Sequence, residues 1–149
     1  MKKLFLLVLL SGCTQMHVST SIAARYVGLH EVADKNALQS MLGIDPAEIE
    51  WCGAFVDYVL KADGLPTAEK PLWSRSYLDW GGEVTEPQYV DLVIFSREGS
   101  SWKGHVGFYV KDLGDTILVL GGNTSDEVGY GAYNKSNLLG FRRHEKSAK

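Results

Sequence analysis

The sequence predicts an α+β domain in which helices come first and a small antiparallel sheet follows. The hydrophobic period changes along the chain. Apolar residues recur at three- and four-residue spacing before about residue 62, and short β-branched runs follow residue 90. The chain has 149 residues, of which 45% are hydrophobic and 22% charged. That composition is typical of one globular domain with a real core, and we find no internal repeat.

The first half carries start and stop signals for four helices. We expect them over residues 22–29, 35–42, about 46–62 and 76–80. The strongest start signal is the run Asp45-Pro46-Ala47-Glu48, in which Asp caps, Pro takes the first helical position and Glu reaches back. The third helix should bury an apolar stripe from Cys52 to Leu60 and end at Gly64-Leu65-Pro66.

The second half carries strands. We expect them over residues 91–95, 106–110, 116–120 and 138–143 because these runs are short, apolar and rich in β-branched and aromatic residues. A hairpin turn around Gly114-Asp115 should join the second and third strands. Helices followed by such a sheet define the expected fold class.

The N-terminus reads as a targeting segment. Two lysines precede the apolar run 4–10, which is too short to span a bilayer, and Ser11-Gly12-Cys13 follows. This pattern resembles a bacterial lipoprotein signal. We therefore expect a signal peptide over 1–12, lipidation of Cys13, a tether over 13–20, a domain over 21–145 and a membrane-anchored envelope protein, on the periplasmic side or in the outer membrane. The alternative is a plain secretory signal in which Cys13 is incidental.

Charge and composition exclude several functions. The formal net charge is −3 and there is no basic run, so nucleic acid is not an expected partner. No second pair of Cys or His stands at ligand spacing, so we expect neither a metal nor a cofactor. His17, His30 and His144 have no partner pattern and are expected to face solvent or lie in the tail.

Cys52 and His105 are the candidate catalytic residues. Each is isolated, and each opens an apolar element: segment 51–56 reads Trp-Cys-Gly-Ala-Phe-Val and segment 104–110 reads Gly-His-Val-Gly-Phe-Tyr-Val. A thiol becomes a strong nucleophile as thiolate, and both a helix start and a histidine base favour that form. The structural alternative is that each residue is simply buried, as lone cysteines often are. Taken together, the two favour catalysis.

Three blocks resemble the CHAP and NlpC-type peptidoglycan peptidases, a branch of the papain-like cysteine hydrolases. They are segment 51–56, segment 104–107 and the run Leu-Gly-Gly-Asn over 120–123, in the family's order, and Gly28 and Glu31 also match. The resemblance is nearest to a small phage- or prophage-associated subgroup. It implies a papain-like fold over most of the chain.

The resemblance also implies an activity and a site. The expected function is hydrolysis of amide bonds in peptidoglycan, with Cys52 as nucleophile, His105 as general base and Asn123 as the residue that orients His105. Asn123 by itself reads as a turn residue, and Asp126 and Asp91 are weaker candidates for its role.

Three further residues are expected to contact substrate. Trp102, in the loop before the histidine, should touch it, Trp51 should lie in the core or in the pocket wall, and Gly104 should allow close approach. Two other functions stay open. One is a non-catalytic module that binds peptidoglycan through the same cleft, and the other is an acyl- or peptidyl-transferase.

The lipid anchor gives a first prediction. Acyl chains on Cys13 would contribute about 0.8 kcal/mol per buried CH₂, and two or more chains hold a protein stably on a membrane. The wild-type protein should therefore partition into detergent and the membrane fraction, and Cys13→Ser should block lipidation and processing. Recovery of the wild-type protein in the soluble fraction, cleaved elsewhere than before Cys13, would contradict the anchor.

Overall fold

The computed structural model describes residues 17–148, so the expected signal peptide and Cys13 lie outside the described residues. The described α-helices are α1 (Ser19–Ala24), α2 (Lys35–Leu42) and α3 (Cys52–Ala62). Three 3₁₀ helices are η1 (Ser74–Asp79), η2 (Lys135–Asn137) and η3 (Glu145–Ala148). The strands are β1 (Gly82–Val84), β2 (Leu92–Ser96), β3 (Gly104–Asp112), β4 (Thr116–Thr124), β5 (Glu127–Asn134) and β6 (Leu138–Arg143).

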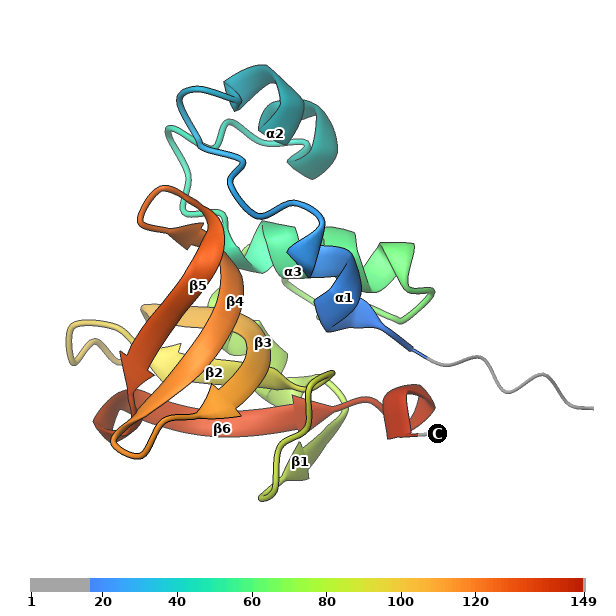
Figure 1. The fold of residues 1–149 in the computed structure, drawn as a ribbon, viewed down its shortest axis with the longest axis vertical. Coiled ribbons are helices and arrows are strands. Elements are labelled where there is room, and N and C mark those ends of the chain that lie inside the picture. The colour runs from blue at the N-terminus through green and yellow to red at the C-terminus, as the bar shows by residue number, and fades with distance from the viewer. Residues whose placement is uncertain (1–16, 149) are drawn as a thin grey trace, which may run out of the picture.

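The strands form one six-stranded sheet in the order β1-β6-β2-β3-β4-β5. Every neighbouring pair is antiparallel. Figure 1 shows a strongly curved sheet with the helices gathered beside it. Both α1 and α3 contact β3 and β4, whereas α2 contacts α3. The expected α+β class, helices first and antiparallel sheet second, is confirmed.

Both faces of the central strands are buried. Leu92 and Ile94 of β2 face the helices, whereas the alternate residues Val93 and Phe95 belong to a second cluster on the other face. The second cluster is completed by Ile117 and Val119 of β4 and by partly buried aromatic residues. Burial on both faces explains why these strands read as continuous apolar runs and not as alternating ones.

Helix α3 begins later than the sequence predicts. The run from Asp45 forms a single turn, in which the Ala47 N–H donates to the Asp45 carboxylate at 3.0 Å and the Ile49 N–H to the Asp45 carbonyl at 3.1 Å. Trp51, with φ −118° and ψ 12°, then breaks the helical path, and its ring enters the core. The Asp45 start signal therefore forms only this single turn, and Cys52 is the first residue of α3.

The end of α3 matches the prediction. The Leu65 N–H donates to the Leu60 carbonyl at 2.9 Å and the Gly64 N–H to the Lys61 carbonyl at 3.1 Å, which is the Schellman arrangement. Gly64 takes a left-handed φ of 71°, a conformation that glycine adopts without a Cβ penalty. The helix over 35–42, ended by Gly43, is also confirmed.

The first helix lies earlier than residues 22–29. It ends at Ala24, because the next segment pairs with β5: the Gly28 N–H donates to the Val128 carbonyl at 2.9 Å, and the Glu31 N–H donates to the Asp126 carbonyl at 2.9 Å. At its other end, α1 includes the buried residues 19 and 20, which the sequence placed in the tether. The folded part of the chain thus reaches back into that segment.

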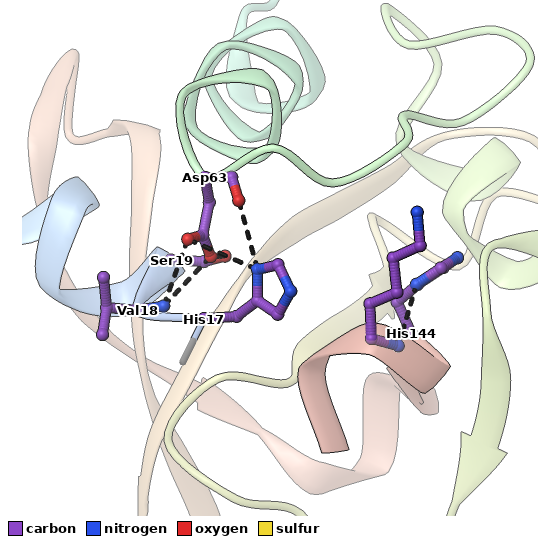
Figure 2. A network of polar contacts seen from close by, with 6 residues as sticks. His17, Val18, Ser19, Asp63 and His144 are labelled. Carbon is purple, nitrogen blue, oxygen red and sulfur yellow. Dashed lines mark hydrogen bonds and ion pairs between the residues drawn. The ribbon is translucent and has the colours of Figure 1, made fainter. Parts of the chain in front are cut away.

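The carboxylate of Asp63 holds the N-terminal segment, as Figure 2 shows. It accepts from the Val18 N–H at 3.0 Å and from the Ser19 hydroxyl, and His17 Nδ1 lies 3.1 Å from the Asp63 carbonyl. The side chain of His17 is only 6% exposed, so it does not face solvent, although it lies at the N-terminal end of the described residues. His144, also drawn in Figure 2, packs on Trp80 with ring centroids 5.5 Å apart.

Two strands were not predicted. The run over β5 contains Gly129 and Gly131, which weaken its strand signal, yet the run pairs with β4 along most of its length. β1 is only three residues long and pairs with β6. β4 also continues beyond residue 120, so that Asn123 lies in a strand.

A buried ion pair joins the start of β2 to the end of β6. Asp91 is fully buried, and its carboxylate accepts from Arg143 Nε at 2.6 Å and from Nη2 at 2.5 Å. The Gln88 N–H also donates to this carboxylate at 2.6 Å. Three charge-assisted hydrogen bonds leave Asp91 fully engaged as a structural residue.

This ion pair gives a second prediction. Arg143→Met leaves a buried carboxylate without its cation, which costs about 3–5 kcal/mol of unfolding free energy. Chemical denaturation of the two proteins at neutral pH measures the difference. Lys135→Met is the matched control, because its partner Asp112 lies at the surface, and it should change stability little. Equal effects of the two substitutions would contradict a structural role for the Asp91 pair.

Candidate active site

Cys52 lies at the N-terminus of α3, buried under the sheet. It is the first residue of the helix and only 4% exposed. Burial raises the pKa of its thiol, whereas hydrogen bonds from the backbone at Val106 and Gly53 and the charge of Arg97 act in the opposite direction. No side chain caps the N-terminus of α3.

His105 lies near the start of β3, directly opposite Phe95 of β2. Its side chain is almost completely buried, at 2% exposure. Burial, with a smaller contribution from the positive charge of Arg97, lowers the pKa of His105 to about 3. The ring is therefore a neutral imidazole at neutral pH, and a neutral ring can accept a proton.

The residue after His105 lies near Cys52, since the backbone of Val106 acts to lower the pKa of the Cys52 thiol. The His105 ring itself packs with Tyr133 and Phe95, which belong to the second cluster on the other face of the sheet. No hydrogen bond links the sulfur to the imidazole itself, because both ring nitrogens lack a partner among the described residues. Burial favours the neutral forms of both groups, and the pairing of the two side chains stays a prediction.

A close approach between β4 and α3 sets this arrangement. A Cβ at Gly122 would lie 2.6 Å from Phe55 Cβ and 2.7 Å from the ring of Trp51. Any larger residue would push the strand away from the first turn of the helix. The glycine pair in the Leu-Gly-Gly-Asn block therefore serves packing beside Cys52.

Asn123 does not orient His105 in this structure. It lies in β4 at a φ of +54°, inside a register shift between Gly121 and Thr124, and its amide makes no hydrogen bond to the imidazole. Asparagine tolerates the left-handed conformation that this bulge needs. Asp91 is engaged by Arg143, and neither ring nitrogen of His105 has a hydrogen-bond partner among the described residues, so neither Asp91 nor Asp126 replaces the amide.

Two of the three residues that were expected to contact substrate are packed against other residues of the protein. Trp51 is fully buried, and its indole N–H donates to the Glu31 carboxylate at 3.1 Å. A Cβ at Gly104 would lie 2.7 Å from the Phe95 carbonyl oxygen and 2.9 Å from Ser74 Oγ. Trp51 is therefore a core residue and Gly104 a packing residue. The core position of Trp51 is one of the two that were expected for it, and neither residue exposes a surface in this structure.

Trp102, in contrast, is 62% exposed. Together with Leu72 and Trp73 it forms an exposed apolar surface, which we call the aromatic ledge. The Trp73 indole N–H donates to the Trp102 carbonyl at 3.0 Å and ties the two tryptophans together. Lys103 lies over the Trp102 ring and Lys70 over the Trp73 ring, at 5.4 and 5.8 Å from the centroids.

The aromatic ledge lies beside the start of α3. The chain just before Leu72 crosses the first turn, so closely that a Cβ at Gly53 would lie 2.4 Å from the Pro71 carbonyl oxygen. Tyr77 donates its hydroxyl hydrogen to the Gly53 carbonyl at 2.9 Å and fixes this crossing. The ledge is therefore held against the element that carries Cys52.

Sequence reasoning missed Tyr133 and Arg97. The Tyr133 ring stacks on His105, and Arg97 pairs with Glu50 at 2.7 Å across the space between β2 and α3. Tyr133 lies in the unpredicted strand β5, so no sequence signal placed it near His105. These residues share a cavity of about 150 Å³, whose lining residues are Phe95, Ser96, Arg97, Glu98, His105, Tyr133, Asn134 and Asn137.

Residues 17–148 contain no cluster of three or more His, Cys, Asp or Glu side chains placed to hold a metal ion. No helix in the part of the chain that the structure describes has the length and apolar character needed to cross a membrane.

The fold is of the papain-like α+β type. It resembles the crystal structure of a lipoprotein-like protein of the NLP/P60 family from Staphylococcus aureus subsp. aureus Mu50, with a TM-score of 0.57 and 22% sequence identity. The match covers 85% of this chain but only 40% of the staphylococcal one. No protein-family model and no curated protein sequence matches the chain. The likeness therefore rests on the fold.

His105 gives a third prediction. Below pH 6.5 the unfolded chain takes up a proton on this residue, whereas the folded protein does so only near pH 3. The unfolding free energy should therefore fall with decreasing pH over this window, with a contribution of up to about 1.4 kcal/mol per pH unit. Urea denaturation of wild type and His105→Gln at several pH values measures it.

The quantity to compare is the slope of the unfolding free energy against pH, because His105→Gln also changes the stability at neutral pH. The variant should lose the contribution of this histidine, so that its unfolding free energy falls less steeply towards acid. His30→Gln, at a partly exposed histidine, controls for the removal of any histidine. Parallel curves for wild type and His105→Gln would show that burial does not hold the ring neutral.

Proposed function

We propose that this protein is a cysteine hydrolase that cleaves amide bonds of peptidoglycan peptides. The observation that carries the proposal is the placement of Cys52 on the first turn of α3, against the backbone that follows His105. The papain-like fold and the resemblance to a lipoprotein-like protein of the NLP/P60 family support the substrate class. The proposal covers a bacterial wall enzyme and a prophage lytic enzyme alike.

In the resting protein the Cys52 thiol and the His105 imidazole are both neutral. The proton is therefore transferred during the attack on the substrate, and no thiolate–imidazolium pair forms beforehand. Burial raises the pKa of Cys52 and lowers that of His105, so the thiol keeps its proton until substrate arrives. His105 then accepts that proton as the sulfur attacks the carbonyl carbon, and it passes the proton to the leaving amine. The thioester that remains is hydrolysed by water, for which His105 again acts as base.

The start of α3 supplies the stabilisation of the oxyanion. Its first-turn N–H groups carry no side-chain cap, and the helix dipole adds partial positive charge at the same end. Donors that are already in place when negative charge develops on the carbonyl oxygen lower the barrier, and each is worth roughly 3–4 kcal/mol in other enzymes.

The aromatic ledge is the proposed substrate platform. Flat indole faces bind sugar rings and peptide groups, and Trp73 and Trp102 are both exposed beside α3. Lys70 and Lys103 flank the two rings and would attract the carboxylates of wall peptides. This surface replaces Trp51 and Gly104 in the proposed substrate contacts.

A lipid anchor on Cys13 would hold the domain close to a membrane. Four residue steps separate Cys13 from His17, where the chain is already fixed to Asp63, and they span at most about 14 Å. Asp63 ends α3, whereas Cys52 begins it. The catalytic end of α3 would then lie roughly 16 Å, one helix length, from Asp63, near which the anchored segment begins.

The second candidate function is a non-catalytic module that binds peptidoglycan. The burial of both Cys52 and His105 favours it, since a closed site does not turn over. The aromatic ledge would then be the whole binding surface. The two functions differ in one observable, the release of fragments from purified peptidoglycan.

The fourth prediction tests the nucleophile. Cys52→Ser and His105→Ala should each lower the release of peptide fragments from purified peptidoglycan by roughly 10³-fold or more. Mass analysis of the released fragments also identifies the bond that is cleaved. His144→Ala is the matched histidine control. It lies beside Trp80 after β6 and should hydrolyse at the wild-type rate.

Two outcomes would contradict the proposal. Near-normal turnover by a folded Cys52→Ser protein would remove Cys52 from the chemistry. Binding of the folded wild-type protein to peptidoglycan without any released fragment would favour the binding module instead.

A further inference from the structure

The imidazole of His105 lacks the hydrogen bond that usually fixes a catalytic histidine. Both ring nitrogens are buried, and neither has a partner among the described residues. A base must present one nitrogen to the nucleophile, so its ring plane has to be fixed by some neighbour. The geometry of the site shows which neighbour is available.

The adjacent strand β4 offers no side chain for this purpose. A Cβ at Gly121 would lie 3.2 Å from His105 Nε2, so position 121 is the β4 position beside the ring, and it is a glycine. Asn123 lies beyond Gly121 at the register shift and makes no hydrogen bond to the ring. A hydrogen-bonding third residue on β4 is thus absent in this structure.

Tyr133, one strand further away on β5, covers the ring instead. The two rings are stacked, with centroids 4.6 Å apart and an angle of 13° between their planes. Tyr133 is itself held on two sides: its ring stacks on Phe95 at 5.2 Å, and its hydroxyl lies 3.2 Å from Thr124 Oγ1. A ring fixed in this way prevents rotation of the imidazole about its Cβ–Cγ bond.

We propose that Tyr133 is the positioning residue of His105, and that its stacked ring sets the imidazole plane in place of a hydrogen-bonding third residue. This inference rests on the proposed function, because it assigns to Tyr133 a role in the same site. The tyrosine does not touch the reacting atoms; it acts through His105.

The stack also suits the charge that His105 acquires. When the ring accepts the Cys52 proton it becomes an imidazolium in a buried place, where a cation is costly. The face of an aromatic ring carries partial negative charge and attracts a cation placed over it. Tyr133 therefore stabilises the protonated state at the step that needs it, while leaving the neutral ring free of a competing hydrogen bond.

The test compares Tyr133→Leu with Tyr133→Phe in the full chain. The readout is the rate of Cys52 alkylation by iodoacetamide between about pH 5 and 10, followed by mass spectrometry of the peptide that carries Cys52. Tyr133→Leu should lower the rate at neutral pH by about 10- to 100-fold, towards the profile of His105→Ala. Tyr133→Phe keeps the stack and should stay within about twofold of wild type.

Tyr130→Leu is the matched control, because Tyr130 lies on the same strand with 48% of its surface exposed. It should keep the wild-type profile. A folded Tyr133→Leu protein with the wild-type alkylation profile would overturn the inference. If that variant does not fold, Tyr133→Trp and Tyr133→Met are compared: the planar Trp should preserve the profile better, and equal profiles would overturn the inference.

The outcomes separate this inference from the function on which it rests. Alkylation needs no peptidoglycan, so it reports the coupling of Cys52 and His105 even where hydrolysis is absent. Unchanged alkylation in His105→Ala would contradict the proposed Cys-His pair and the inference with it. A changed profile in His105→Ala beside a wild-type profile in Tyr133→Leu would contradict only the role of Tyr133.

Discussion

The packing of α3 against β3 and β4 is the contact on which the rest of the structure depends. Its apolar stripe, Phe55, Val56, Val59 and Leu60, is fully buried, and each such side chain contributes roughly 1.5–3 kcal/mol. Together they match the whole net stability of an ordinary domain, which is about 5–15 kcal/mol. The same contact holds Cys52, the first residue of α3, near the backbone of Val106 in β3.

The depth of this packing has an electrostatic consequence. Burial favours the neutral form of both the thiol and the imidazole, and neither ring nitrogen of His105 has a hydrogen-bond partner among the described residues. Apolar neighbours and a stacked tyrosine hold His105, whereas a hydrogen-bonded base would give up one nitrogen as donor. The His105 ring is therefore held by close packing and not by hydrogen bonds. A close-packed interior makes such a restraint effective.

Sequence patterns predicted the elements that depend on local chemistry. The helix that ends at Gly43, the stop at Gly64 and the strand over 138–143 follow from residues that favour one backbone conformation. The pairing of the lone cysteine with the lone histidine stays a prediction, although each does begin an apolar element. The class of fold followed from the change in hydrophobic period.

The features that the sequence did not reveal depend on contacts between distant segments. β5 forms because β4 offers it a partner, although its glycines argue against a strand, and Tyr133 could not be placed without it. The sequence left open whether Trp51 lies in the core or in a pocket wall, and its indole hydrogen bond to Glu31, twenty positions earlier, could not be foreseen. Asn123 fits a hydrogen-bonding role by its position in the block, but the bulge in β4 decides where its amide lies.

The two ends of α3 have different roles, and this polarity links the fold to the proposed function. Its C-terminus carries Asp63, which fixes the N-terminal segment through three hydrogen bonds to residues 18 and 19. Its N-terminus carries Cys52 and the uncapped N–H groups, with the aromatic ledge beside them. A domain tethered at one end of a rigid helix presents the other end to its surroundings. The wall polymer would then meet the tryptophans of the ledge and the first turn of α3 on the side away from the attachment point.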